Sequence, residues 1–171
     1  GVKELVVASY QAASGAGQAG IDALHDQISQ VAGKQLGSST KDVRNEVTEL
    51  GPFPAPLAMN VVPWAGSLKE NGYTSEELKV RNESRKILGL PDLRVSGICV
   101  RVPVFTGHSL AINAEFARPM TVARAKELLA DAPGVEPVWR NKAKHGISAV
   151  NVQLLFLRHP FLNFFPLAPR R

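Results

Sequence analysis

The stretch 93–118 of this 171-residue chain carries the side chains best suited to chemistry. Arg101 lies in a run of alternating apolar residues, and His108 lies in the turn at residues 106–108 that follows this run. A fixed guanidinium suits bidentate binding of a carboxylate, and an imidazole suits proton transfer near neutral pH. A strand arginine and a turn histidine are also common as purely structural residues, so the two readings stay open at this point.

Two further segments carry candidate binding groups. The turn Ser14-Gly15-Ala16-Gly17 could present backbone N–H groups to an anion or a polar ligand; the alternative is a tight turn in which Ser14 caps a helix. Glu76 and Lys79 are three residues apart on a predicted helix and therefore share a face. They form either a solvated surface pair or a charged face turned towards a charged ligand.

The elements that must position these groups begin with a buried strand over residues 3–10. After the Gly-containing turn, apolar residues recur at helical spacing and predict one buried stripe, which Gly33 ends. This stripe consists of Ile21, Leu24, Ile28 and Val31. Strand, turn and helix in this order indicate the start of an α/β unit.

Two later helices have clear start signals. Thr74 and Glu77 match a capping box, which predicts a polar helix from about Ser75 to Leu88. A short helix should follow Thr121 and end before Pro133.

The alternation over 98–105 and 109–116 predicts an antiparallel hairpin closed at residues 106–108, with Cys99 and Arg101 on the face opposite the valine row. The Pro- and Gly-rich stretch 51–66 predicts an ordered irregular connection around a short strand at Met59–Val62.

Composition narrows the function classes. With 44% hydrophobic and 20% charged residues the chain is typical of a globular domain, and its single cysteine excludes a disulfide framework and a cysteine-based zinc site, so no metal is expected. Residues 1–139 carry 14 basic and 15 acidic side chains, whereas residues 140–171 carry six basic and no acidic ones. This uneven charge argues against a nucleic-acid-binding surface.

No apolar run is long enough to span a membrane, and no signal peptide is evident, so we expect a cytoplasmic protein. Residues 139–171 form an atypical basic and apolar tail. For this tail we favour a strand over 150–157 and a poorly ordered terminus over binding to an anionic membrane surface.

Four fragments occur in a fixed order: SYQAASGAGQAG, NVVPWAGS, SEELKVRNESRKILGLP and CVRVPVFTGHS. Together they resemble the catalytic and dimerisation domain of bacterial aspartate-semialdehyde dehydrogenase over residues 1–138. The resemblance implies an α/β fold of the α+β type, with a mixed sheet like that of the C-terminal domain of glyceraldehyde-phosphate dehydrogenase. It also implies helices on one face of the sheet, a homodimer built with the other face, and an N-terminal Rossmann domain that this sequence lacks.

The family reduces L-aspartyl 4-phosphate with NADPH to L-aspartate 4-semialdehyde and releases phosphate, a step towards lysine, threonine, methionine and diaminopimelate. A cysteine thiolate attacks the acyl phosphate, and the thioester then accepts hydride, which divides one hard displacement into two easier steps. The resemblance implies a role for seven residues of this chain: acid/base catalysis by His108, binding of the substrate carboxylate by Arg101, substrate positioning by Gln11, contact with the substrate ammonium by Glu76 and with phosphate by Lys79, and nicotinamide contacts by Ser14 and Gly15.

The departures from the family pattern matter as much as the matches. The family's nucleophilic cysteine belongs to an Asn-Cys-Thr-type motif upstream of the first strand, and this chain begins after that point. Cys99 does not replace it, because a thiol buried inside a strand has a raised pKa and is inert. No role is transferred beyond residue 138. A catalytically inactive dimerisation module and a related acyl-phosphate reductase, such as one acting on N-acetylglutamyl phosphate, remain the alternatives. The Glu76/Lys79 pair and Arg101 favour a substrate with a free amino group, which argues against that reductase.

Overall fold

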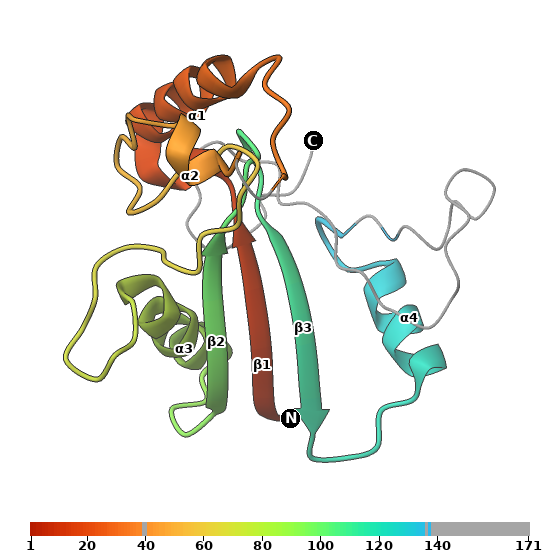
Figure 1. Cartoon of the computed structure of the whole chain (residues 1–171). Helices are drawn as coiled ribbons and strands as arrows, with labels where there is room; N and C mark the ends of the chain where they lie inside the picture. Colours follow the sequence, from red (N-terminus) through yellow and green to blue (C-terminus); the bar gives the residue numbers. More distant parts are fainter. Residues whose placement is uncertain (39–40, 136, 138–171) are drawn as a thin grey trace.

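A three-stranded mixed sheet forms the centre of the computed structural model, which describes residues 1–38, 41–135 and 137. The central strand β1 (Val2–Gln11) runs parallel to β2 (Arg94–Arg101) and antiparallel to β3 (Ser109–Phe116) (Figure 1). The order β2-β1-β3 confirms the expected mixed sheet and the strand predicted at residues 3–10.

The predicted antiparallel hairpin is wrong, because β2 and β3 do not pair with each other. The strand β2 already ends at Arg101, and residues 102–108 cross the end of β1 before the chain turns back as β3 on the far side of β1. The N–H groups of Ala13 and Ser14 hold this crossing segment by donating to the carbonyls of Val104 and Phe105 at 2.8 and 3.0 Å. Alternation identified the strand residues, but it could not show that β1 inserts between the two strands.

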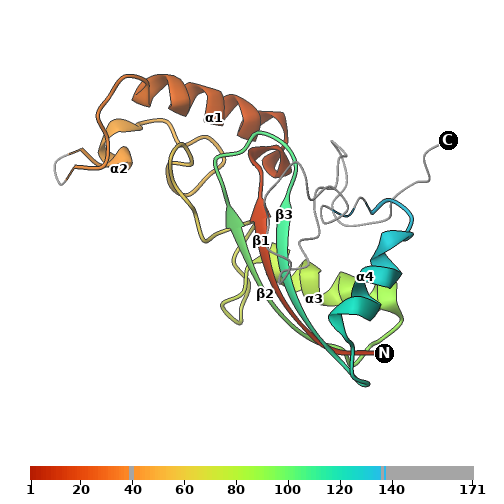
Figure 2. The ribbon, with the colours of Figure 1, turned by 90° about the vertical axis from the view of Figure 1, so that its right-hand side faces the viewer.

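The helix α3 (Ser75–Leu88) packs behind β2, whereas α4 (Val122–Ala130) lies beyond the edge strand β3 and has no buried residue. Figure 2 shows the sheet from its edge, with both helices on one side and the opposite face uncovered along most of the strands. Both predicted caps are present: Thr74 and Glu77 form a capping box, and the Thr121 side chain accepts from the N–H of Arg124.

A second layer covers the end of the sheet where β1 and β2 finish. It contains the single turn η1 (Ala13–Ala16), the helix α1 (Gly17–Val31) and the short helix α2 (Val43–Glu46) (Figures 1 and 2). The prediction that Ser14 caps α1 is wrong. Because η1 lies between the strand and α1, the cap position falls to Ala16, which has no side-chain cap.

The buried face of α1 differs from the predicted apolar stripe. Leu24 and Val31 are buried, but Ile28 is exposed, and Gln27 is fully buried instead. The Gln27 carboxamide makes four hydrogen bonds to backbone groups of residues 49–58, of 2.7 to 3.2 Å. A buried amide with every bond satisfied is stable in a core, and here it ties the connection to α1.

The connection 51–66 is irregular, as predicted, but the strand predicted at Met59–Val62 is not formed. Only Val62 pairs with the sheet, through a bridge in which its N–H and carbonyl bond the carbonyl and N–H of Arg101 at 2.9 and 2.8 Å. The strand and terminus predicted within 139–171 lie outside the described residues. Within the described part of the chain, no helix is both long and apolar enough to cross a membrane.

Candidate active site

The carboxyl ends of the two parallel strands bring Gln11 and Arg101 together. Their Cα atoms are register partners, and both side chains are buried on the face that α3 covers, with 2% and 6% of their surface exposed. The Val62 bridge fixes the backbone of Arg101 from the other side. The two residues therefore lie side by side in one site, as the family pattern implies.

The guanidinium of Arg101 is buried but almost unpaired. Its Nη1 donates to the carbonyl of Ala12 at 3.0 Å, and no carboxylate of the described residues lies within ion-pair distance. Burial lowers the pKa of Arg101, while the negative field of Glu76 opposes that shift. A buried charge without a partner is costly, so this arrangement suits an anionic ligand that completes the pair.

His108 binds the other backbone group of Ala12, its N–H. The N–H of Ala12 donates to Nδ1 of His108 at 3.0 Å, so the neutral ring is assigned its proton on Nε2. The backbone of Ala12 thus fixes two functional groups at once, because its carbonyl accepts from Arg101. Nε2–H is the group that the ring can offer to a substrate oxygen.

The surroundings of His108 keep its ring neutral. Burial is the main cause that lowers the pKa of His108, and the positive charge of Arg101 lowers it further. The Glu76 carboxylate and the Gly107 backbone oppose this shift with smaller effects. A neutral imidazole with Nε2–H can act as a hydrogen-bond donor and as an acid towards a strongly basic oxygen.

Gly15 is required by close approach. A Cβ atom placed on it would collide with the Arg101 guanidinium and would lie 3.3 Å from Cε1 of His108. The expectation that this turn offers free N–H groups to an anion is wrong for Ser14 and Gly15. Their N–H groups donate to the carbonyls of Phe105 and Ala12 at 3.0 and 3.1 Å.

Glu76 and Lys79 extend the site from α3. Their side chains form an ion pair of 2.8 Å, in which Glu76 is 15% exposed and Lys79 is 39% exposed. The Glu76 carboxylate is near enough to act on the pKa of both Arg101 and His108. The solvated surface pair is therefore the weaker of the two predictions, because one partner faces the buried groups.

Cys99 belongs to the core. It is fully buried, and burial is the main cause that raises its pKa to about 12, with the carboxylates of Glu77 and Glu76 adding to the shift and Arg101 opposing it. A thiol with this pKa is protonated near neutral pH. The structure therefore supports the prediction that Cys99 is not a nucleophile.

Sequence reasoning missed the groups that act through their backbone. Ala12 and Val62 have small or apolar side chains that carry no chemical signal, yet their peptides fix His108 and Arg101. Phe105, in the crossing segment, was also missed as a contact of the site. Its ring stacks on that of His25 in α1, with centroids 4.1 Å apart, and anchors the segment that carries His108.

Comparisons with known proteins agree with this architecture. A family model described as the dimerisation domain of semialdehyde dehydrogenases matches residues 1–146. An aspartate-semialdehyde dehydrogenase of Streptomyces akiyoshiensis is 53% identical over 138 residues, and that of Corynebacterium glutamicum is 50% identical over 140. The matches cover 80% and 81% of this chain but only 41% of each relative.

The solved structures give the same result. The structure of aspartate semialdehyde dehydrogenase II from Vibrio cholerae complexed with ASA matches with a TM-score of 0.68 and 34% identity. The match covers 80% of this chain and 37% of the Vibrio cholerae chain. The mixed sheet with its buried cationic site thus defines a dimerisation domain of the dehydrogenase type. The chain belongs to the semialdehyde dehydrogenase family.

Proposed function

We propose that this domain supplies the substrate-binding groups of an aspartate-semialdehyde dehydrogenase. The enzyme would reduce L-aspartyl 4-phosphate to L-aspartate 4-semialdehyde with NADPH and release phosphate, with a nucleophilic cysteine provided from outside the given sequence. The observation that carries this proposal is the buried Arg101 guanidinium, which makes one hydrogen bond and no ion pair among the described residues. A substrate carboxylate completes its bonding.

The neighbouring groups match the remaining charges of that substrate. Glu76 would accept from the substrate ammonium, and Lys79, its ion-pair partner, would bind the phosphate. Gln11 would hold the acyl group near the incoming thiolate. A substrate without a free amino group offers no ammonium to the Glu76 carboxylate, which then keeps Lys79 as its partner, so the arrangement favours a free amino group over an acetylated one.

His108 would act at the acyl oxygen. Its Nε2–H can donate a hydrogen bond to this oxygen and stabilise the negative charge that develops there as the tetrahedral species forms. The same tautomer cannot accept a proton at Nε2, so abstraction from a thiol would require the bond from Ala12 to break. The geometry therefore favours the donor role over the base role.

The turn at Ser14 and Gly15 fits a flat cofactor ring. Gly15 is exposed, has no side chain, and lies against both Arg101 and His108. These two residues would hold the nicotinamide of NADPH, which supplies hydride when it is bound.

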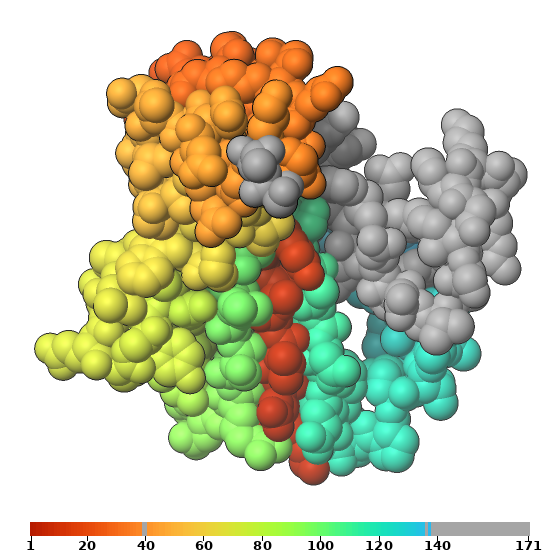
Figure 3. All heavy atoms as spheres, in the orientation of Figure 1, coloured from red at the N-terminus to blue at the C-terminus, as the bar shows by residue number. Residues whose placement is uncertain are grey.

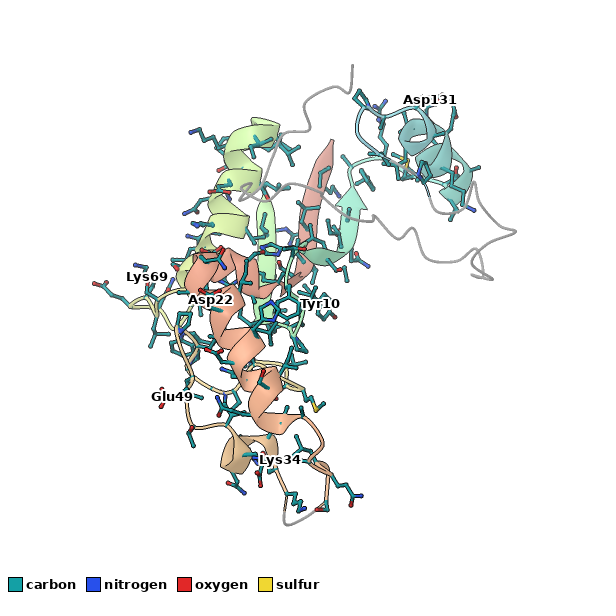
Figure 4. The ribbon with its side chains drawn as sticks, turned by 90° about the horizontal axis from the view of Figure 1, so that it is seen from above. Tyr10, Asp22, Lys34, Glu49, Lys69 and Asp131 are labelled. Atoms are coloured by element: carbon teal, nitrogen blue, oxygen red, sulfur yellow. The ribbon has the colours of Figure 1, made fainter. Side chains whose placement is uncertain are left out.

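We further infer that the uncovered face of the sheet forms a homodimer. Val6, Tyr10 and Ile98 are exposed there. Figure 3 shows β1 uncovered between β2 and β3, and in Figure 4 the labelled Tyr10 lies on the opposite side of the sheet from α3. Large exposed apolar patches mark interaction sites, and a second copy offers a matching surface. The family model is itself described as a dimerisation domain.

A chimera tests the proposed activity. Residues 1–138 replace the matching stretch of the Streptomyces akiyoshiensis relative, and turnover of L-aspartyl 4-phosphate with NADPH is measured. We expect turnover within about tenfold of the relative, and a loss of about 10²-fold in kcat/KM for Arg101→Lys, since the ammonium cannot form the bidentate pair. A folded, dimeric chimera without turnover would refute the proposal.

A further inference from the structure

One buried polar atom stands out against the well-bonded core. Ser9 Oγ has no hydrogen-bond partner in the structure, and it is the one such buried side-chain atom among the described residues. Ser9 is fully buried in β1, where its register partners are Cys99 on β2 and Leu110 on β3. Buried hydroxyl groups are nearly always bonded, so this one requires an explanation.

A second side chain without a hydrogen bond, less completely enclosed than the Ser9 hydroxyl, lies two residues along the strand. Gln11 points to the same face as Ser9, because side chains two apart in a strand share a face. Its side chain is 2% exposed, and within the part of the chain that the structure describes its carboxamide has no hydrogen bond. Two residues of a strand span about 6.6 Å, a distance that the three rotatable bonds of a glutamine and a serine hydroxyl can bridge.

We propose that Ser9 is a positioning residue that acts through Gln11. When substrate is bound, the Ser9 hydroxyl donates to Oε1 of Gln11 and fixes the orientation of the carboxamide. Both protons of Nε2 then face the substrate, whose carboxylate, acyl and phosphate groups all present oxygen acceptors. The inference rests on the proposed function, since that function defines which end of the Gln11 amide must face the ligand.

This role predicts an unusual combination of effects. Ser9→Ala removes no hydrogen bond from the substrate-free protein, so the free energy of unfolding should stay constant or rise. In the loaded site the carboxamide loses its anchor and presents its oxygen as readily as its nitrogen. A serine that only stabilises the fold would show the reverse, with lower stability and unchanged kinetics.

The experiment compares four proteins in the chimera described above: wild type, Ser9→Ala, Gln11→Ala and the double variant. We expect kcat/KM to fall about tenfold for Ser9→Ala and more for Gln11→Ala. Because Ser9 acts through Gln11, the double variant should be no worse than Gln11→Ala alone. Thermal unfolding of the full 171-residue chain supplies the stability of the Ser9→Ala variant.

Val7→Ala is the matched control, since Val7 is buried on the same face of β1 one step further from the site. It should lower the unfolding temperature and leave kcat/KM unchanged. The inference fails if Ser9→Ala destabilises the chain, leaves kcat/KM within twofold of wild type, or adds its full effect to that of Gln11→Ala. Turnover by the wild-type chimera tests the proposed function separately, because each Ser9 result is a ratio to that protein.

Discussion

The two faces of the sheet present different kinds of side chain from the neighbouring strands β1 and β2. On the face under α3, residues 9, 11, 99 and 101 are buried and end in the groups of the candidate site. On the other face, alternate residues such as Val6 and Ile98 are apolar and about half exposed. Because successive side chains of a strand point to opposite faces, the proposed function places substrate binding on one face and self-association on the other.

This comparison leads to the expectation that substitutions on one face affect catalysis and those on the other affect assembly. The largest effect should come from His108→Ala in the chimera, with kcat/KM reduced about 10²–10⁴-fold because a proton donor at the acyl oxygen is lost. His108→Asn keeps a donor but cannot transfer a proton, so it should recover only part of the loss. Full activity in His108→Ala would remove His108 from the mechanism.

The next effect belongs to the open face. Ile98→Asp should weaken self-association of the full chain by about 10²-fold or more, since it places a charge in the apolar contact. Ile87→Asp on α3 is the matched control, because Ile87 and Ile98 are exposed to 51% and 50%. Sedimentation velocity over a concentration series measures both. Equal weakening by the two substitutions, or a monomeric wild type, would contradict the assignment of this face.

The sequence identified much of the helix-covered face and less of how it is assembled. Arg101, His108 and Gln11 were found because their types are chemically distinctive and their motifs match a family. The place of β1 between β2 and β3 was missed, since two alternating strands joined by a short loop look the same whether or not a third strand lies between them. The backbone N–H and carbonyl of Ala12, which bond His108 and Arg101, give no side-chain signal in the sequence.

The period-2 geometry of the predicted strand could have identified Ser9, to which the family pattern assigns no role. Ser9 and Gln11 are two apart in a predicted strand, so their shared face was predictable. Their common lack of bonds was not, because it depends on what α3 and the connection 51–66 bring over the strand. The same reasoning applies to Gln27. In the sequence it is a polar residue that interrupts an apolar stripe, but in the structure four hydrogen bonds to backbone groups hold it in the core.

A smaller effect on KM should distinguish Gly15 from Gly17, two glycines of the turn beside the site. Gly15→Ala should raise KM about tenfold in the chimera, because the added Cβ displaces the Arg101 guanidinium. Gly17→Ala meets no neighbouring atom, but φ and ψ of +74° and −165° are essentially restricted to glycine, so it should lower stability by about 1–3 kcal/mol and leave KM unchanged. Steady-state kinetics and thermal unfolding of both variants measure this split. Similar kinetics for the two variants would mean that Arg101 does not depend on space at Gly15.

The smallest effect concerns Cys99. This residue lies on the same helix-covered face of the sheet as the candidate site, but it belongs to the hydrophobic core. Burial and nearby carboxylates raise its pKa to about 12, so the native full chain should react with a thiol reagent at pH 8 only as fast as it unfolds. Because the chain has one cysteine, the modified fraction can be read directly from its mass. Denaturant should release the full reactivity, and Cys99→Ala in the chimera should keep kcat/KM within about twofold, since no reacting atom is lost. Rapid labelling of the native chain, or loss of turnover in Cys99→Ala, would instead show that Cys99 belongs to the active site and not to the core.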